Sequence, residues 1–206
     1  MFTGLIQHVG RVAAACGVGD GVRLELDPCG WSHTPEVGSS IAVNGVCLTI
    51  LGCGDVQPWC FDVVAQTISK TTVSTWSAGM EVNLESAALL STPMGGHFVQ
   101  GHVDGVGVVS AIDAGDRSAT MSITLPDSLK AYVFDQGSIA IDGVSLTVAG
   151  VTEEGLEVAL IPETLKMTTL SQRRVGDGVH VETDMLTRAV VETTQRTHAA
   201  SETSMP

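Results

Sequence analysis

The sequence predicts an all-β fold of two tandem six-stranded antiparallel Greek-key barrels, followed by a C-terminal α-helix. Three observations predict it: an internal duplication, short alternating apolar runs separated by turns, and a strand-favouring composition. The 206 residues include 23 Gly, and 44% of them are hydrophobic but only 4% aromatic. Abundant Val, Ile and Thr favour strands, so the two cores are expected to be built from aliphatic side chains.

The duplication rests on four blocks that recur in the same order at almost constant spacing. Residues 3–12 align with 100–109, 44–49 with 142–147, 66–72 with 163–169, and 79–85 with 176–182. A repeat of this length is a small domain rather than a propeller blade or solenoid unit. We therefore expect domains at 1–94 and 95–184, with a helix and tail at 185–206.

The elements of the first copy follow from its alternation and its turns. Alternating residues predict strands over 5–14 and 22–27, and Asn44-Gly45 between apolar runs predicts a tight hairpin. The other expected elements are a loop or short helix at 28–38, strands at 40–43, 46–51, 59–64 and 81–85, a turn at 52–57, and a short helix at 67–76. Closure into a barrel leaves no exposed sheet edge.

The second copy repeats this order, with a turn at 113–116, a short helix at 126–132 and a hairpin at Asp142-Gly143. Only residues 87–96 separate the copies, so the domains should be close neighbours. After Asp184, one helical face carries apolar or small residues: Leu186, Ala189, Val190 and Thr193. This helix is expected to pack against another subunit, and residues 199–206 to form a disordered tail.

Charge and cysteine content exclude several classes of protein. Ten basic and 23 acidic residues give a net charge of −13, which argues against nucleic acid or an anionic membrane as a partner. Five cysteines, all in the first copy and without a CxxC pair, are not a disulfide framework. The absence of a signal peptide or membrane-length apolar run makes the cytoplasm the expected location.

Positions that differ between the copies are candidates for chemistry. Cys47 aligns with Ser145, although a free cysteine is also a common buried apolar residue. His97 and His102 lie among glycines that permit close approach of a ligand to the backbone. They are candidates for proton transfer or ligand hydrogen bonding, or for a structural role. No metal site is expected, because too few zinc ligands lie nearby.

Five motifs together closely resemble the riboflavin synthase family of the alpha-chain type, over nearly the whole chain. They lie at 1–4, 44–49, 95–105, 142–147 and 161–165. The resemblance implies a homotrimer held by C-terminal helices, with the first barrel of one subunit facing the second barrel of its neighbour. It also implies a cofactor-free dismutation of two molecules of 6,7-dimethyl-8-ribityllumazine. A four-carbon unit passes between them, giving riboflavin and 5-amino-6-(D-ribitylamino)uracil. Association with lumazine synthase is left open.

The resemblance also implies site residues. It places Phe2, Cys47, His102, Ser145, Thr147 and Asp184 around the reaction centre. Ser145 and His102 would assist proton transfer and addition in the second barrel, while Cys47 or a water beside it would supply the nucleophile. Ligand contacts of the first barrel would be Gly4, Leu5, Ile6, Thr49, Asp62, Val63, Val64, Ala65, Gln66 and Thr67, and those of the second Gly101, Val103, Ile161, Pro162, Thr164 and Leu165. Further expected contacts are Cys47, Leu48, His102, Gln136, Ser145, Leu146, Thr147, Glu163 and Lys166.

The chain departs from the family pattern at three positions. Gln136 stands where many members have Lys, and Gln66 where Glu is common, so ligand contacts there would be weaker. His180 stands where the first copy has Asn83, and is expected to be a change on the strand surface.

The main alternative is a non-catalytic lumazine- or flavin-binding antenna protein, in which the barrels remain and the chemistry is lost. The central His-rich stretch, Cys47 and Ser145-Leu146-Thr147 favour the enzyme. An oligomeric scaffold without a ligand would leave these residues unexplained.

Overall fold

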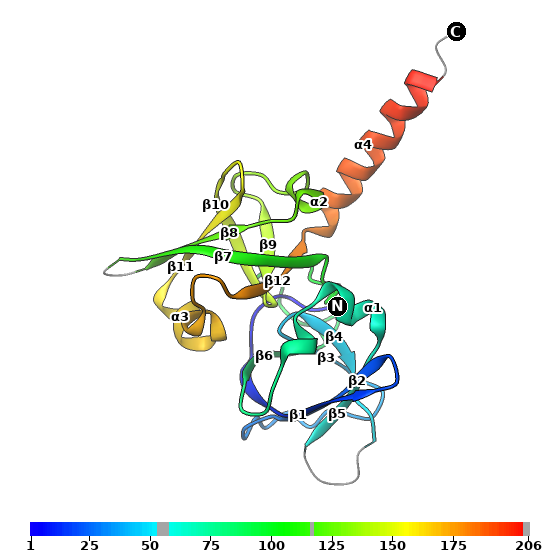
Figure 1. Cartoon of the computed structure of the whole chain (residues 1–206), viewed down its shortest axis with the longest axis vertical. Helices are drawn as coiled ribbons and strands as arrows, with labels where there is room; N and C mark the ends of the chain where they lie inside the picture. Colours follow the sequence, from blue (N-terminus) through cyan, green and yellow to red (C-terminus); the bar gives the residue numbers. More distant parts are fainter. Residues whose placement is uncertain (53–57, 116–117, 204–206) are drawn as a thin grey trace.

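The computed structural model describes residues 1–52, 58–115 and 118–203. Figure 1 shows two β lobes side by side, with one long helix extending away from the second lobe. Both lobes are antiparallel and six-stranded, which confirms the all-β prediction. No helix in the described part of the chain is long and apolar enough to cross a membrane.

The first sheet has the strand order β4-β3-β6-β1-β2-β5. Its strands are β1 (His8–Val18), β2 (Gly21–Asp27), β3 (Ser40–Val43), β4 (Val46–Thr49), β5 (Trp59–Val63) and β6 (Glu81–Ser86). An isolated bridge joins Leu51, beyond β4, to Cys60 of β5, with an N···O distance of 2.9 Å. The predicted turn at 53–57 and Cys53 lie outside the described residues.

The second sheet is a closed barrel with the order β10-β11-β8-β7-β12-β9, and β9 pairs with β10 to complete the ring. Its strands are β7 (Gly105–Ala114), β8 (Ala119–Thr124), β9 (Ser138–Ile141), β10 (Val144–Val151), β11 (Gly155–Leu160) and β12 (Gly178–Thr183). The predicted closure is thus found in this copy, whereas in the described part of the first copy only the isolated bridge between Leu51 and Cys60 links the β4 end of the sheet to β5.

Short helices follow the strands of both copies. These are α1 (Ala65–Lys70) and η1 (Val73–Thr75) on the first sheet, and α2 (Asp127–Lys130), α3 (Pro162–Met167) and η2 (Thr169–Gln172) on the second. The helix expected at 67–76 is therefore split into two. In chain order, α1 and η1 of the first copy correspond to α3 and η2 of the second, whereas α2 has no counterpart among the described residues of the first. Pro162 suits the first turn of α3, where a backbone N–H would have no helical partner.

Of the loop or short helix predicted at 28–38, the structure has the loop, because Cys29, Gly30 and Gly38 take positive φ angles of 50°, 81° and 87° that interrupt a helix. One expectation about the end of the chain was wrong. The helix α4 (Met185–Thr203) continues through residues 199–203, which were expected to be disordered. No Gly or Pro interrupts it there. Residues 204–206 lie outside the described part.

The two sheets meet at their predicted hairpin turns. Asn44 and Gly45 have φ angles of 45° and 77°, and Asp142 and Gly143 of 47° and 80°, which confirms both tight turns. A Cβ atom on Gly45 would lie 2.6 Å from the Gly143 backbone nitrogen, and the reverse distance is the same. Glycine is therefore required at both turns for the sheets to approach.

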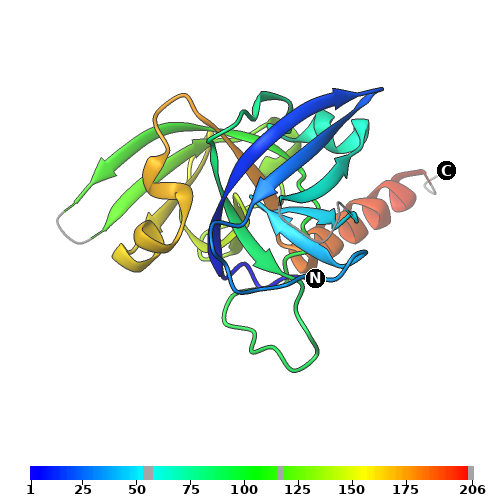
Figure 2. The same ribbon diagram turned by 90° about the horizontal axis from the view of Figure 1, so that it is seen from below.

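The cores are mainly aliphatic, as the composition predicts. The second core contains only Val, Leu, Ile, Met and Ala, while Phe61 and Trp76 add aromatic volume to the first. A small third cluster of Phe2, Ala42, Val99 and Ala140 lies between the sheets. Figure 2, a view from below, shows the two sheets next to each other.

Three of the five cysteines, Cys16, Cys29 and Cys47, are free thiols. Cys60 is disulfide-bonded. A disulfide in this copy was not foreseen from the sequence.

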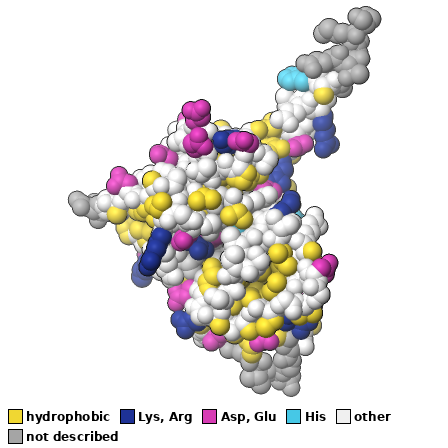
Figure 3. Space-filling model, viewed as in Figure 1, with side chains coloured by type: hydrophobic (Ala, Val, Ile, Leu, Met, Phe, Trp, Pro, Cys, Tyr) yellow, Lys and Arg dark blue, Asp and Glu magenta, His cyan; other side chains and the backbone are white. Residues whose placement is uncertain are grey.

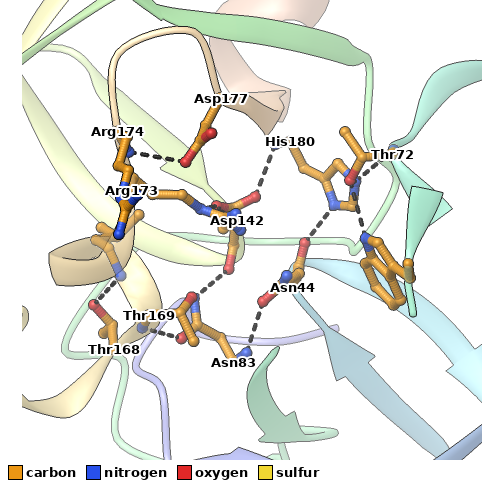
Figure 4. Close-up of polar contacts among 12 residues, drawn as sticks. Asn44, Thr72, Asn83, Asp142, Thr168, Thr169, Arg173, Arg174, Asp177 and His180 are labelled. Atoms are coloured by element: carbon orange, nitrogen blue, oxygen red, sulfur yellow. Dashed lines mark hydrogen bonds and ion pairs between the residues drawn. The ribbon is translucent and has the colours of Figure 1, made fainter. Parts of the chain in front are cut away.

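A buried polar network joins the copies, and Figure 4 shows it around His180. Asn83 donates from Nδ2 to the Asp142 carbonyl at 3.0 Å, and its Oδ1 accepts from the Thr169 N–H at 2.8 Å. His180 makes the equivalent pair of bonds. Its Nδ1 lies 2.8 Å from the Asn44 carbonyl, and its Nε2 accepts from the Thr72 N–H at 2.9 Å.

The His180 ring therefore does in the second copy what the Asn83 amide does in the first, since each donates to one carbonyl and accepts from one backbone N–H. The carbonyl at Nδ1 requires a donor there and the N–H at Nε2 requires an acceptor, so the ring is the neutral Nδ1–H tautomer. Only 1% of the residue is exposed. The expectation of a surface substitution was wrong, because the alternation of β12 does not reveal that both of its faces are covered.

Acid should destabilise the protein through His180. Burial lowers the pKa of this imidazole, against the opposing charge of Asp142. Below the ordinary histidine pKa of about 6.5 the unfolded chain takes up a proton that the folded chain refuses, so stability falls as the pH falls. The slope from this group reaches about 1.4 kcal/mol per pH unit.

His180→Asn, which restores the residue of the first copy, should remove this slope. Urea denaturation of both proteins between about pH 5 and pH 8 measures it. Groups distant from position 180 are common to both proteins, so the difference between the two curves reports His180 together with its charged neighbours Asp142 and Arg173. Parallel curves would contradict the assignment.

Candidate functional site

Two extended segments cross between the sheets. We call residues 2–6 the first arm and residues 99–103 the second arm. Phe2 and Val99 pair through backbone bonds of 2.7 and 3.1 Å. Beyond this pair the arms separate: the Gly4 carbonyl accepts from the Ser145 N–H, and the Gly101 carbonyl accepts from the Cys47 N–H, both at 2.8 Å. Each arm therefore contacts the sheet of the other copy.

The arms complete two pockets of equivalent construction. The first pocket, of about 400 Å³, is formed by β4, α1 and the second arm, and is lined by Val46, Cys47, Gln66, Thr67, Lys70, Thr71, Gly101, His102 and Val103. The second pocket, of about 230 Å³, is formed by β10, α3 and the first arm, and is lined by Gly4, Leu5, Ile6, Val144, Ser145, Ile161, Glu163, Thr164, Met167 and Thr168. Almost every residue of one lining has its aligned counterpart in the other.

This crossing corrects the assignment of ligand contacts made from the sequence. Gly4, Leu5 and Ile6 were assigned to the first barrel, but they line the second pocket. Gly101 and Val103 were assigned to the second barrel, but they line the first pocket. The reason is that each arm leaves its own copy before it reaches a pocket.

Glycine is required where each arm meets its strand. Gly4 and Gly101 have φ angles of 72° and 78°, in the left-handed region. A Cβ on Gly4 would lie 2.5 Å from the Ser145 Cβ, and one on Gly101 would lie 2.6 Å from the Cys47 Cβ. Conformation and space both exclude a side chain at these positions.

Ser145 is paired with His97, not with His102. The His97 Nδ1 lies 2.7 Å from the Ser145 Oγ, and its Nε2 is buried without a hydrogen-bond partner. Desolvation lowers the pKa of His97, although the charge of Asp184 opposes this shift. The ring is therefore neutral at pH 7 and can exchange a proton with the serine hydroxyl.

His102 belongs to the other pocket. It lines the first pocket with Cys47, a half-buried free thiol. Within one chain Ser145 therefore contacts His97 and not His102, because residues 97 and 102 fall on either side of the point where the second arm crosses. A role for His102 beside Ser145 stays a prediction.

The charged residues of the pockets differ. Lys70 lines the first pocket where Met167 lines the second, and Gln66 stands where the second has Glu163. The first pocket thus carries a cation and the second an anion. The two pockets therefore have equivalent backbones but side chains of opposite charge.

The structure places the remaining candidates outside the two pocket linings. Phe2 is buried between the sheets, Leu48 and Leu146 pack in the cores, and Thr49 and Thr147 are exposed on their strands. Asp62, Val63, Val64 and Ala65 line a separate depression of about 300 Å³, where Asp62 pairs with Arg23 at 2.5 Å. Gln136 is exposed in a turn with a φ of 65°, and Pro162, Leu165 and Lys166 lie on α3.

Asp184 caps α4 and does not line either pocket. Its carboxylate accepts bonds from the N–H groups of Leu186 and Thr187 at 3.3 and 3.2 Å, and from the Thr187 hydroxyl at 3.0 Å. Its negative charge also acts on His97, where it opposes the lowering of the pKa of that ring.

Sequence reasoning missed several lining residues: Val46, Lys70, Thr71, Val144, Met167 and Thr168. All of them lie inside the aligned blocks. The alignment of Lys70 with Met167 was therefore a usable signal of a difference between the two pockets.

A family model, curated relatives and solved structures all match this chain over most of its length. The lumazine binding domain family matches residues 3–87 and again residues 100–184. Among the relatives are riboflavin synthases of Brucella abortus (39% identical, 91% of this chain and 95% of that protein) and Chlamydia muridarum (39% identical, 97% and 98%). That of Mycobacterium tuberculosis is also 39% identical, over 92% of this chain and 96% of its own length.

Similar solved structures are complexes of LumP. One holds 6,7-dimethyl-8-(1'-D-ribityl) lumazine (TM-score 0.80, 26% identity) and one holds riboflavin (TM-score 0.80, 27% identity). Each alignment covers 89% of this chain and 99% of LumP.

Proposed function

Because this chain belongs to the riboflavin synthase family of tandem lumazine-binding domains, we propose that it converts two molecules of 6,7-dimethyl-8-ribityllumazine into riboflavin and 5-amino-6-(D-ribitylamino)uracil. One lumazine gives a four-carbon unit to the other, and no outside reductant or oxidant is needed. The observation that carries the proposal is the presence of two equivalent pockets in one chain. A reaction between two copies of one molecule needs two similar binding sites.

The protein's task in this reaction is to align two rings and to move protons. The 7-methyl group of the lumazine is acidic because the heterocycle stabilises its anion, so no metal or cofactor is invoked. In the second pocket, Ser145 and His97 move protons to and from the bound ring, supported by their 2.7 Å contact. In the first pocket, Cys47 or a water beside it adds to the acceptor ring, with His102 nearby.

A lumazine- or flavin-binding protein without catalysis is the alternative, because the LumP structures share the fold and hold such ligands. The contact between His97 and Ser145 and the free thiol of Cys47 favour catalysis. Neither group is needed merely to fill a pocket.

One assay separates the two functions. Purified protein is incubated with 6,7-dimethyl-8-ribityllumazine, without added metal or cofactor, and riboflavin is followed by its absorbance and fluorescence. One pyrimidine diamine for each riboflavin is the expected stoichiometry. Tight binding without conversion would instead establish the antenna function.

We also propose a homotrimer in which α4 supplies the contact between subunits. On α4, Leu186 and Val190 are 57% and 66% exposed. With Phe134, 53% exposed, they line an apolar groove of about 430 Å³ at the foot of the helix. Figure 3 shows the helix standing clear of the body. In the trimer, the first pocket of one subunit would face the second pocket of its neighbour. The domain limits 1–94, 95–184 and 185–206, a cytoplasmic location and association with lumazine synthase stay predictions.

Deleting residues 186–206 should give a monomer with little activity, because the two lumazines would no longer be held in facing pockets. Light scattering gives the mass and the riboflavin assay the rate, which we expect to fall by about 100-fold. Deleting only residues 204–206 is the control and should change neither. An active monomer would contradict the shared site.

A further inference from the structure

Two buried carboxylates outside the pockets each hold one arm. Glu85 on β6 is 1% exposed and Glu182 on β12 is 5% exposed. Glu85 accepts from the Thr3 N–H at 2.6 Å, the Thr3 hydroxyl at 2.7 Å and the Gly4 N–H at 3.0 Å. It therefore fixes the first arm at the residue that contacts Ser145.

Glu182 does the same for the second arm. It accepts from the Gln100 N–H at 2.6 Å and from the Gly101 N–H at 2.9 Å. Within the described part of the chain, neither carboxylate forms a salt bridge with a Lys or Arg. Backbone N–H groups of the arms are thus the main partners of both charges. Hydrogen bonds to an ionised acceptor are the strong kind.

Because the arms cross, each carboxylate lies in one sheet and serves the pocket of the other. Glu182 belongs to the second sheet, but its arm presents the Gly101 carbonyl to Cys47 and places His102 in the first pocket. Glu85 belongs to the first sheet, but its arm presents the Gly4 carbonyl to Ser145 in the second pocket.

We propose that Glu85 and Glu182 are crossed positioning residues, Glu182 for the Cys47 pocket and Glu85 for the Ser145 pocket. As regards lumazine, the inference rests on the proposed function. Neither residue touches the ligand. Each acts by holding two consecutive residues of an arm in the geometry that shapes the opposite pocket.

Replacing either Glu by Gln keeps its shape and removes half of its accepting capacity. An amide NH₂ then faces a backbone N–H, so one arm bond is lost. Burial raises the pKa of both carboxyls, and the arm N–H groups oppose that shift. Both oxygens of each carboxylate accept a backbone N–H of an arm, an arrangement that suits an acceptor on both sides and that Gln cannot supply.

The first test needs no ligand. Amide hydrogen exchange reports the Cys47 N–H, which is bonded to Gly101, and the Ser145 N–H, which is bonded to Gly4. Glu182→Gln should speed exchange at Cys47 by about tenfold or more and leave Ser145 unchanged, and Glu85→Gln should do the reverse. Glu157→Gln, on β11 and away from both arms, is the matched control.

The second test measures affinity pocket by pocket with riboflavin, which does not turn over. Protection of the Cys47 thiol from iodoacetamide, followed by mass spectrometry of its peptide, reports the first pocket. The thiol introduced by Ser145→Cys reports the second. Glu182→Gln should raise the riboflavin concentration needed to protect Cys47 by about tenfold, and Glu85→Gln should do so only at position 145.

The outcomes separate the two proposals. Effects confined to each residue's own sheet, or equal effects at both sites, would overturn the crossed assignment and indicate general loosening. If riboflavin and lumazine protect neither thiol in the proteins that keep Glu85 and Glu182, the proposed function fails. The ligand-free exchange then decides the inference alone.

Discussion

Gly101→Ala is expected to lower riboflavin formation by at least about 100-fold and to abolish ligand binding in the first pocket. The new methyl group would lie 2.6 Å from the Cys47 Cβ and 2.8 Å from its backbone nitrogen. Backbone atoms cannot swing aside as a flexible side chain can, so the second arm must move away from β4. That movement breaks the 2.8 Å bond from Cys47 to Gly101 and displaces His102.

The control must separate steric contact from backbone strain. Gly79 also has a positive φ, of 92°, but no atom lies within 4 Å of a Cβ built there. Gly79→Ala therefore carries the left-handed strain, of about 1 kcal/mol, without the collision. It should lower stability slightly and leave activity unchanged. Equal loss of activity in both variants would show that the contact of the second arm with Cys47 is not what the activity depends on.

Riboflavin titration and steady-state rates measure both variants. The second pocket of Gly101→Ala should still bind ligand, because its own arm is held by Glu85. Loss of both pockets would mean that the arms move as one unit through their Phe2–Val99 pair.

Local features of the fold could be predicted from the sequence because they depend on neighbouring residues. The Asn44-Gly45 and Asp142-Gly143 turns need positive φ at both positions, and the dipeptides supply it. The aligned blocks also identified equivalent residues such as Cys47 and Ser145. These signals act over a few residues, or compare one copy with the other.

The crossing of the arms could not be predicted in this way. Alignment states that Gly4 matches Gly101, but both the crossed and the uncrossed arrangement satisfy that match. The choice is made by long-range contacts between the copies, such as the bond from the Ser145 N–H to the Gly4 carbonyl and that from the Cys47 N–H to the Gly101 carbonyl. For the same reason, the sequence could not show that His97 rather than His102 contacts Ser145 within one chain.

His180 was misjudged for a different reason. Its polarity and its place in a strand of alternating residues are typical of an exposed position. In the structure an imidazole copies the donor and acceptor of the Asn83 amide within a buried junction. His and Asn are equivalent at this place because each offers one N–H donor and one acceptor atom, which residue polarity alone does not reveal.

The difference in charge between the pockets bears on the proposed reaction. Two identical molecules must take unequal parts, since one gives four carbons and the other receives them. Lys70 in the first pocket and Glu163 in the second provide unequal surroundings within equivalent backbones. A cation favours a developing anion on the bound ring, whereas a carboxylate opposes it. The duplication thus supplies two sites, and these two substitutions make them chemically distinct.

His97→Gln is expected to lower kcat by about 100-fold while changing KM little. Glutamine can still hydrogen-bond the Ser145 hydroxyl across the present 2.7 Å contact, but it cannot take up a proton. Ser145→Ala should have a similar effect, and the double variant should be no slower than the slower single one, because the two groups act as a unit. Steady-state kinetics on purified proteins, with riboflavin as the product measured, give all three comparisons.

The pH profile distinguishes His97 from His102. Burial lowers the pKa of His97, so its neutral form persists to pH values below the ordinary histidine pKa of about 6.5. A rate that depends on neutral His97 should therefore stay flat as the pH falls to 6.5 and decline only below it. In His97→Gln this acid limb should vanish from the residual activity. If the acid limb remains in His97→Gln and disappears in His102→Gln, the proton is moved in the first pocket. The Ser145–His97 pair would then only hold the second pocket in its shape.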